Sequence, residues 1–157
     1  SEMEAAGIKI SDPAKSMLKD KEFVPGKNPE EATLIHLTVA DLDFKSSATT
    51  DQIYERAQIL GLELCPADVG PNYRLKYRNQ PFNFDEEIHI GMKQITVSDG
   101  SSFVFKLERQ TNFYGRGGLW LIGRWALPAY KWSLRSEFVF RLHGSGLRPL
   151  VSLHSSR

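Results

Sequence analysis

Apolar and polar residues alternate with a period of two through most of the second half of the chain. The alternation runs through residues 73–78, 88–92, 103–108, 119–125 and 138–142. Alternation of this kind is typical of β-strands that bury one face. Because the connections between these segments are short and have no helical pattern, we predict an antiparallel β-meander of about five strands. We expect this sheet to be curved or partly closed into a barrel.

Two segments of the first half show helical spacing instead. Residues 11–13, Ser-Asp-Pro, are a typical helix start, because Ser or Asp caps the first turn and Pro suits it; they predict a helix over 12–20. Thr49 and Gln52 have capping-box spacing, which predicts a second helix over 49–60. Since the apolar face of the sheet needs a cover, we predict an α+β fold with two or three short helices on the sheet.

The composition is that of one globular domain. The chain has 157 residues, of which 41% are hydrophobic and 25% are charged, so it is long enough to bury a substantial core. The regular patterns end near residue 143, and Gly and Ser residues follow. We therefore predict a single domain over residues 1–143 and a flexible tail over residues 144–157.

Composition also bears on the compartment. The sequence has no run of about 18 apolar residues, which a membrane-spanning helix would need. Its first residues lack the basic and then apolar pattern of a secretory signal. The single cysteine, Cys65, excludes an internal disulfide and a cysteine-rich metal site. We therefore expect a cytoplasmic protein with no membrane partner and no cofactor.

Charge is distributed unevenly along the chain. Residues 1–70 contain 7 basic and 13 acidic residues, whereas residues 71–157 contain 13 basic and 6 acidic residues. The second half also holds 14 of the 17 Phe, Trp and Tyr residues. Opposite charges on two halves are explained either by an internal interface or by a basic surface that binds a partner.

A basic and aromatic sheet face has the composition of an interface hot spot. Our first hypothesis is a non-catalytic module that docks an unknown protein partner through this face and the loop over residues 110–118. The alternative is a nucleic-acid-binding domain that uses the same face, because Arg neutralises phosphates and aromatic rings stack on bases. The candidate binding residues are Arg74, Lys76, Arg78, Tyr114, Arg116, Trp120, Arg124 and Arg141.

Candidate catalytic chemistry is sparse. The four histidines are far apart in the sequence, and it contains no nucleophile-elbow, phosphate-loop or metal-ligand motif. Glu87 and His89 would share one face of a strand, where the carboxylate would orient the imidazole. Cys65 would need a base close in space to act as a nucleophile. The second alternative is an enzyme or toxin of unrecognised type with its site near Cys65–Pro71 and His89, although no catalytic residue is assigned.

Residues Leu64 to Pro71 read Leu-Cys-Pro-Ala-Asp-Val-Gly-Pro, and Leu75 and Tyr77 follow. This LCPAxVGPxxRLxY pattern resembles a family of small uncharacterised bacterial proteins, and the resemblance extends over most of residues 5–142. It implies a bacterial, single-domain, cytoplasmic protein. Because the family has no established activity, the resemblance implies no catalytic residues.

Overall fold

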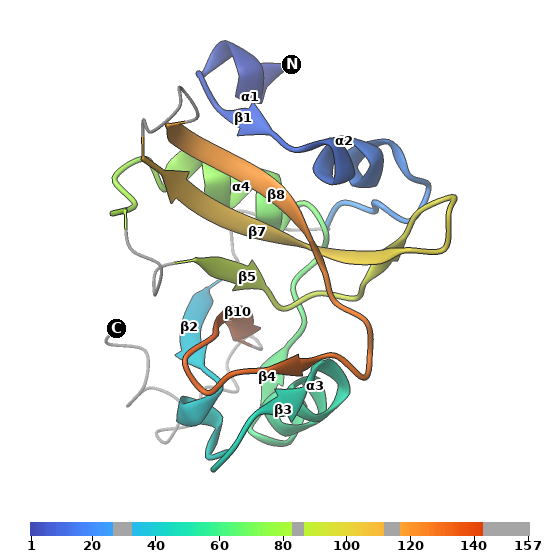
Figure 1. The fold of residues 1–157 in the computed structure, drawn as a ribbon, viewed down its shortest axis with the longest axis vertical. Helices are drawn as coiled ribbons and strands as arrows, with labels where there is room; N and C mark the ends of the chain where they lie inside the picture. The colour runs from blue at the N-terminus through green and yellow to red at the C-terminus, as the bar shows by residue number, and fades with distance from the viewer. Residues whose placement is uncertain (27–32, 83–86, 112–116, 143–157) are drawn as a thin grey trace.

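The computed structural model describes residues 1–26, 33–82, 87–111 and 117–142 (Figure 1). The helices within these ranges are α1 (Glu2–Ala5), α2 (Asp12–Lys19), α3 (Thr50–Ile59) and α4 (Val69–Lys76), with a short 3₁₀ helix, η2 (Ala40–Leu42). The strands are β1 (Lys9–Ile10), β2 (Leu34–Thr38), β3 (Ala48–Thr49), β4 (Leu62–Glu63), β5 (Ile88–Ile90), β6 (Ile95–Thr96), β7 (Ser102–Gln110), β8 (Gly118–Trp125), β9 (Lys131–Trp132) and β10 (Glu137–Leu142).

Eight of the described strands form one mixed sheet. Its order is β1-β8-β7-β5-β10-β2, with β4 beside β10 and β6 beside β7, while β3 and β9 form a separate pair. β7 and β8 are antiparallel, but β1 runs parallel to β8 and β5 runs parallel to β10. The α+β class is therefore confirmed. The prediction of a pure antiparallel meander is wrong, because β10 returns beside β5 after β7 and β8 and pairs with it in parallel. The predicted curvature or partial closure is also wrong, because the sheet is neither closed nor curled.

Both predicted helices are present, and their caps explain where they begin. The Ser11 hydroxyl accepts a hydrogen bond from the backbone N–H of Ala14 at 3.3 Å, at the start of α2. Thr49 and Gln52 form a reciprocal capping box before α3, with N–H to side-chain distances of 2.9 and 3.1 Å. Each cap satisfies backbone donors that a helix start leaves unpaired.

Helix α4 occupies residues where alternation predicted a strand. The N–H of Tyr77 donates to the carbonyl of Tyr73 at 2.8 Å and closes the last helical turn. The side chain of Arg74 is completely buried, whereas Lys76 is exposed. In a strand, Arg74 and Lys76 would both point to the polar side. In the helix they point to different sides, and Arg74 faces the interior.

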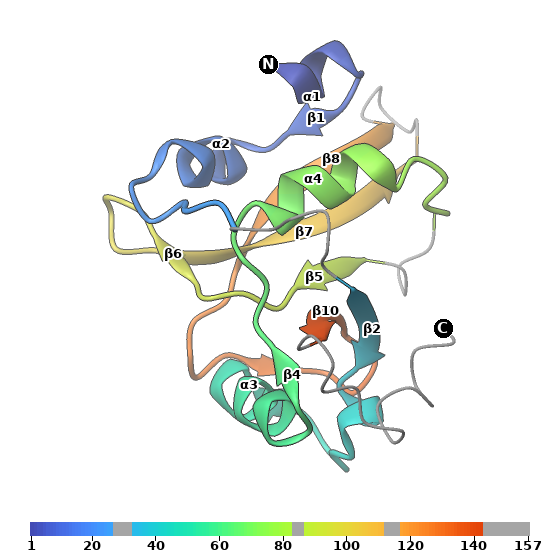
Figure 2. The ribbon, with the colours of Figure 1, turned by 180° about the vertical axis from the view of Figure 1, so that it is seen from behind.

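Helices α2 and α4 cover one face of the β7–β8 half of the sheet (Figure 2). Two glycines allow this close approach. A Cβ at Gly123 of β8 would lie 2.8 Å from the side chain of Pro13, and a Cβ at Gly70 of α4 would lie 2.7 Å from Phe105. We call this side the α2/α4 face.

His89, Lys106 and Arg124 belong to the opposite face, since His89 is paired with Lys106 and Arg124 adjoins the α2/α4-facing Gly123. On this side, Tyr54 of α3 packs on Phe140 of β10, with 6.1 Å between the ring centres, and α3 lies beside β4 (Figure 1). The rings of Trp132 from β9 and Phe138 are in contact, with 5.0 Å between their centres. The predicted tail, residues 144–157, lies outside the described residues. No described helix is long and apolar enough to cross a membrane.

Candidate functional site

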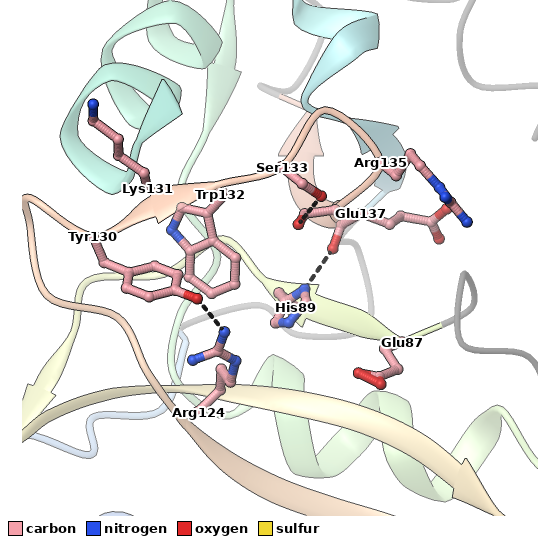
Figure 3. Close-up of a pocket in the computed structure, with 10 residues that line it drawn as sticks. Glu87, His89, Arg124, Tyr130, Lys131, Trp132, Ser133, Arg135 and Glu137 are labelled. Carbon is pink, nitrogen blue, oxygen red and sulfur yellow. Dashed lines mark hydrogen bonds between the residues drawn. The ribbon is translucent and has the colours of Figure 1, made fainter. Parts of the chain in front are cut away.

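A cavity of about 500 Å³ opens on the opposite face of the sheet, beside β5 (Figure 3). His89 of β5, Glu87 just before that strand and Arg124 of β8 line the cavity. Residues 130–133 and 135–137 complete its wall. The cavity thus lies where the connection from β8 to β10 passes over the sheet.

Hydrogen bonds to the start of α3 fix this connection. The Thr50 hydroxyl donates to the carbonyl of Leu127 at 2.9 Å and accepts from the indole N–H of Trp132 at 2.8 Å. The backbone N–H groups of Thr50 and Asp51 donate to the carbonyls of Tyr130 and Pro128 at 3.0 and 3.1 Å. Since Thr50 is completely buried, these bonds hold the indole of Trp132 in place over the sheet.

His89 is a neutral acceptor at the base of the cavity. Its Nδ1 lies 3.0 Å from the carbonyl oxygen of Glu137. A carbonyl accepts only, so Nδ1 carries the proton. Burial lowers the pKa of His89 to about 3, and the nearby Lys106 and Arg124 lower it further, so the ring is neutral at pH 7 and Nε2 is unprotonated. Glu87 does not orient the imidazole as predicted, because the Glu137 carbonyl has that role.

Arg124 is the cation that the structure places on aromatic rings beside His89. The carbon of its guanidinium lies 4.9 Å from the ring centre of Tyr130 and 4.8 Å from that of Trp132. It donates to the Tyr130 hydroxyl at 2.9 Å and to the Trp125 carbonyl at 3.1 Å. Stacking and hydrogen bonding together orient the guanidinium plane.

The two carboxylates that line the cavity are already engaged. Glu87 pairs with the ammonium of Lys106 at 3.3 Å. The Glu137 carboxylate lies 3.1 Å from Nδ1 of His36, whose Nε2 lies 2.6 Å from the Tyr73 hydroxyl. Burial raises the pKa of Tyr73 to about 12, so its hydroxyl stays protonated at pH 7. The sequence pattern did not indicate this Tyr–His–Glu chain, which joins α4, β2 and β10.

The structure separates the predicted binding residues. Arg124 alone among those described lines the cavity. Arg74 is buried under the sheet, which removes it from any surface, and Lys76 is exposed on α4. Arg78 donates to the carbonyl of Ala6 at 2.9 Å.

The remaining candidates also lie apart. Arg141 pairs with Glu63 of β4 at 2.8 Å. Trp120 is half-buried on β8, with the ammonium of Lys9 at 5.8 Å from its ring centre. Tyr114 and Arg116 lie outside the described residues. The described candidates therefore do not form one basic sheet face.

The second predicted site is also divided. Cys65 lines a different cavity, of about 360 Å³, together with Pro66 and Lys93, whereas His89 lines the first. The Cys65 thiol is buried and donates to the carbonyl of Val139 at 3.6 Å. Burial raises its pKa to about 12, which opposes nucleophilic activity. No cluster of three or more His, Cys, Asp or Glu residues suited to a metal occurs in the described ranges.

We predict that Cys65 is unreactive in the folded protein. Native protein mixed with a disulfide reagent such as DTNB at pH 8 is expected to react at least about a hundredfold more slowly than protein unfolded in guanidinium, because burial excludes the reagent and keeps the thiol protonated. Absorbance of the released thiolate measures both rates. Equal rates would show that Cys65 is accessible and would restore it as a candidate nucleophile.

Comparisons of the chain with protein-family models, curated proteins and solved structures find no match. The interpretation of the cavity therefore depends on its own geometry and chemistry.

Proposed function

We propose that the protein is a non-catalytic binding module that docks a protein partner through the surface beside this cavity. Three large apolar side chains are exposed along the segment that leads from the end of β8 past this cavity: Trp125 by 59%, Leu127 by 49% and Tyr130 by 40%. Tyr130 lines the cavity with Arg124, whereas Trp125 and Leu127 line a separate recess. Together with Arg124 they define the docking surface. The exposure of three large apolar side chains within so short a segment is the observation that carries the proposal, because exposed aromatic and apolar side chains are typical of a protein interface.

The docking surface is held in shape before any partner binds. The carbonyls of Leu127 and Tyr130 accept hydrogen bonds from Thr50, as described above. A further recess of about 220 Å³ lies between Trp125, Leu127 and residues 99–102, and offers room for an apolar side chain of the partner. A preformed surface favours affinity because fewer side chains lose freedom on binding.

The two alternative functions have less support. A nucleic-acid site needs several cations along one surface, and Arg74, Arg124 and Arg141 are separated. A catalytic site needs convergent reactive groups, and Cys65 and His89 line different cavities. The resemblance at residues 64–77 extends the proposal to a cytoplasmic module of a bacterial cell.

The test uses a displayed library of random 12-residue peptides selected on the wild-type protein. Selected peptides are expected to weaken at least about tenfold on Trp125→Ala, since truncating an anchoring aromatic residue costs about 2 kcal/mol or more. Ile59→Ala is the matched control, because Ile59 is 67% exposed on α3, away from the docking surface. Titration calorimetry of the selected peptides measures both variants.

Three results would contradict the proposal. The first is that selection yields no peptide, and the second is that selected peptides bind Trp125→Ala as well as wild type. The third is that Ile59→Ala weakens peptide binding as much as Trp125→Ala does. Fluorescence anisotropy with labelled single-stranded and duplex DNA and RNA, at 50 and 200 mM salt, tests the alternative. Micromolar binding that falls steeply with salt and is lost in Arg124→Gln would favour the nucleic-acid function instead.

A further inference from the structure

Arg124 has hydrogen-bond donors to spare. A guanidinium carries five N–H groups, and two atoms of this one, Nη1 and Nη2, donate to the Trp125 carbonyl and the Tyr130 hydroxyl. Arg124 forms no ion pair with a carboxylate of the described residues. Its plane is nevertheless fixed by two aromatic rings. A fixed guanidinium fork with remaining N–H groups matches a carboxylate.

The acidic side chains near Arg124 leave this role to the ligand, and Lys131 and Arg135 add two more cations to the lining. Lys106, the cation paired with His89 across the sheet, is held by Glu87 at 3.3 Å and by Glu108 at 2.9 Å. The other lining carboxylate, Glu137, contacts His36. The cavity's own acids thus have partners other than Arg124, and a carboxylate from outside would meet Arg124 with little competition.

His89 adds an acceptor beside this cation. The ring centre of Trp132 lies 4.7 Å from that of His89 and 4.8 Å from the guanidinium carbon of Arg124. One indole therefore holds both groups at the same cavity. With the proton on Nδ1, the Nε2 atom of His89 keeps a lone pair that can accept a hydrogen bond. The ligand that suits the cavity carries a carboxylate and an N–H donor close to it.

An acidic residue within a peptide chain has this combination, because its carboxylate lies near backbone N–H groups. We propose that an Asp or Glu side chain of the docked partner enters the cavity, with its carboxylate on Arg124 and a neighbouring backbone N–H on Nε2 of His89. This inference rests on the proposed function. The cavity, at about 500 Å³, has room for the side chain together with its backbone, and Tyr130, which lines the cavity and is 40% exposed, would contact the flanking residues of the partner.

The test is an NMR titration of ¹⁵N-labelled protein with N-acetyl-aspartate N-methylamide. The imidazole nitrogens of His89 and Nε of Arg124 report on binding. We expect saturable shifts of both signals, with an affinity at least about fivefold higher than for N-acetyl-asparagine N-methylamide, which has the same shape without the charge. Arg124→Gln is expected to abolish the difference between the two probes. Lys15→Gln is the control, because it removes one charge from the exposed side of α2, across the sheet. This variant is expected to keep the difference in affinity between the two probes.

Several outcomes would overturn the inference. The aspartate probe produces no shifts at His89, both probes bind equally, or Lys15→Gln weakens binding as much as Arg124→Gln. Inorganic phosphate binding more tightly than the aspartate probe would assign the cavity to phosphate instead. The probe is too small to depend on Trp125, so these failures are separate from a failure of the docking proposal, which the Trp125→Ala peptide measurement reports.

Discussion

Lowering the pH from 7 to 4 is expected to destabilise the wild-type protein more than a His89→Asn variant. The folded state holds His89 neutral, because burial lowers its pKa to about 3, while the unfolded chain protonates it near its ordinary pKa of 6.5. A lowered folded-state pKa contributes stability above pH 6.5, and this stability is lost as the pH falls toward 3. The expected loss is up to tenfold in the folding equilibrium per pH unit, or about 3 kcal/mol between pH 6.5 and 4.

The His89→Asn variant isolates this effect. The Asn amide nitrogen takes the place of Nδ1 and can donate to the Glu137 carbonyl, but the side chain does not titrate. The variant will be less stable at pH 7, since it loses the ring contacts with Trp132 and Phe138. Urea unfolding at pH 7.5, 6, 5 and 4 gives both curves, and the acidic residues common to both proteins cancel in the difference. Parallel curves would show that His89 takes up a proton in the folded state.

The burial of His89 illustrates what the sequence could not predict. The alternation of residues 88–92 places His89 on the polar side of a strand, and that assignment to a face is correct. The segment that buries this side comes from residues 130–137, whose path is fixed by hydrogen bonds to Thr50. Periodicity describes one strand and its two faces, so a cover supplied by a distant segment leaves no local signal.

Local signals also explain which helices were predicted. Helix α1 was missed although Ser1 caps it, because four residues are too short to show a helical period. Helices α2 and α3 were predicted because each begins with a side-chain cap. Helix α4 begins at Val69, its N-cap residue Asp68 makes no side-chain capping hydrogen bond, and its residues 73–76 alternate as a strand would. Strand neighbours were also beyond prediction, since the parallel contact of β5 with β10 joins residues about fifty positions apart. Of the candidate site, the sequence supplied Arg124 and His89 but not their common neighbour Trp132.

Arg74 replaced by Met is expected to lower the free energy of unfolding by about 2–4 kcal/mol. The buried guanidinium donates to the Gln80 side chain at 2.7 Å, to the Trp120 carbonyl at 3.3 Å, to the Glu108 carbonyl at 3.4 Å and to the carbonyl of Tyr77. One side chain thus ties the end of α4 and the segment after it to strands β7 and β8. Methionine fills similar space but leaves these acceptors without that donor, at about 1–3 kcal/mol for each one that finds no other.

An opposing effect limits the size of this loss. Arg74 forms no ion pair with a carboxylate of the described residues, and burial lowers its pKa to about 10, so removing the guanidinium also removes a desolvated charge. We expect the lost hydrogen bonds to prevail, because four acceptors lose a bond from a charged donor at once, whereas the desolvation relieved is that of a single group.

Two further variants separate the hydrogen bonds from the charge. Arg74→Lys keeps the charge but replaces the planar fork by one ammonium, which cannot span the same acceptors, so we expect it to be destabilised as well. Arg78→Met is the control, because Arg78 is exposed and only four residues away; its effect is expected to be under about 1 kcal/mol. Urea unfolding at pH 7 measures all three variants. Arg74→Met as stable as wild type would mean that the desolvated charge outweighs the hydrogen bonds, and that Arg74 is held in the core at a cost to stability.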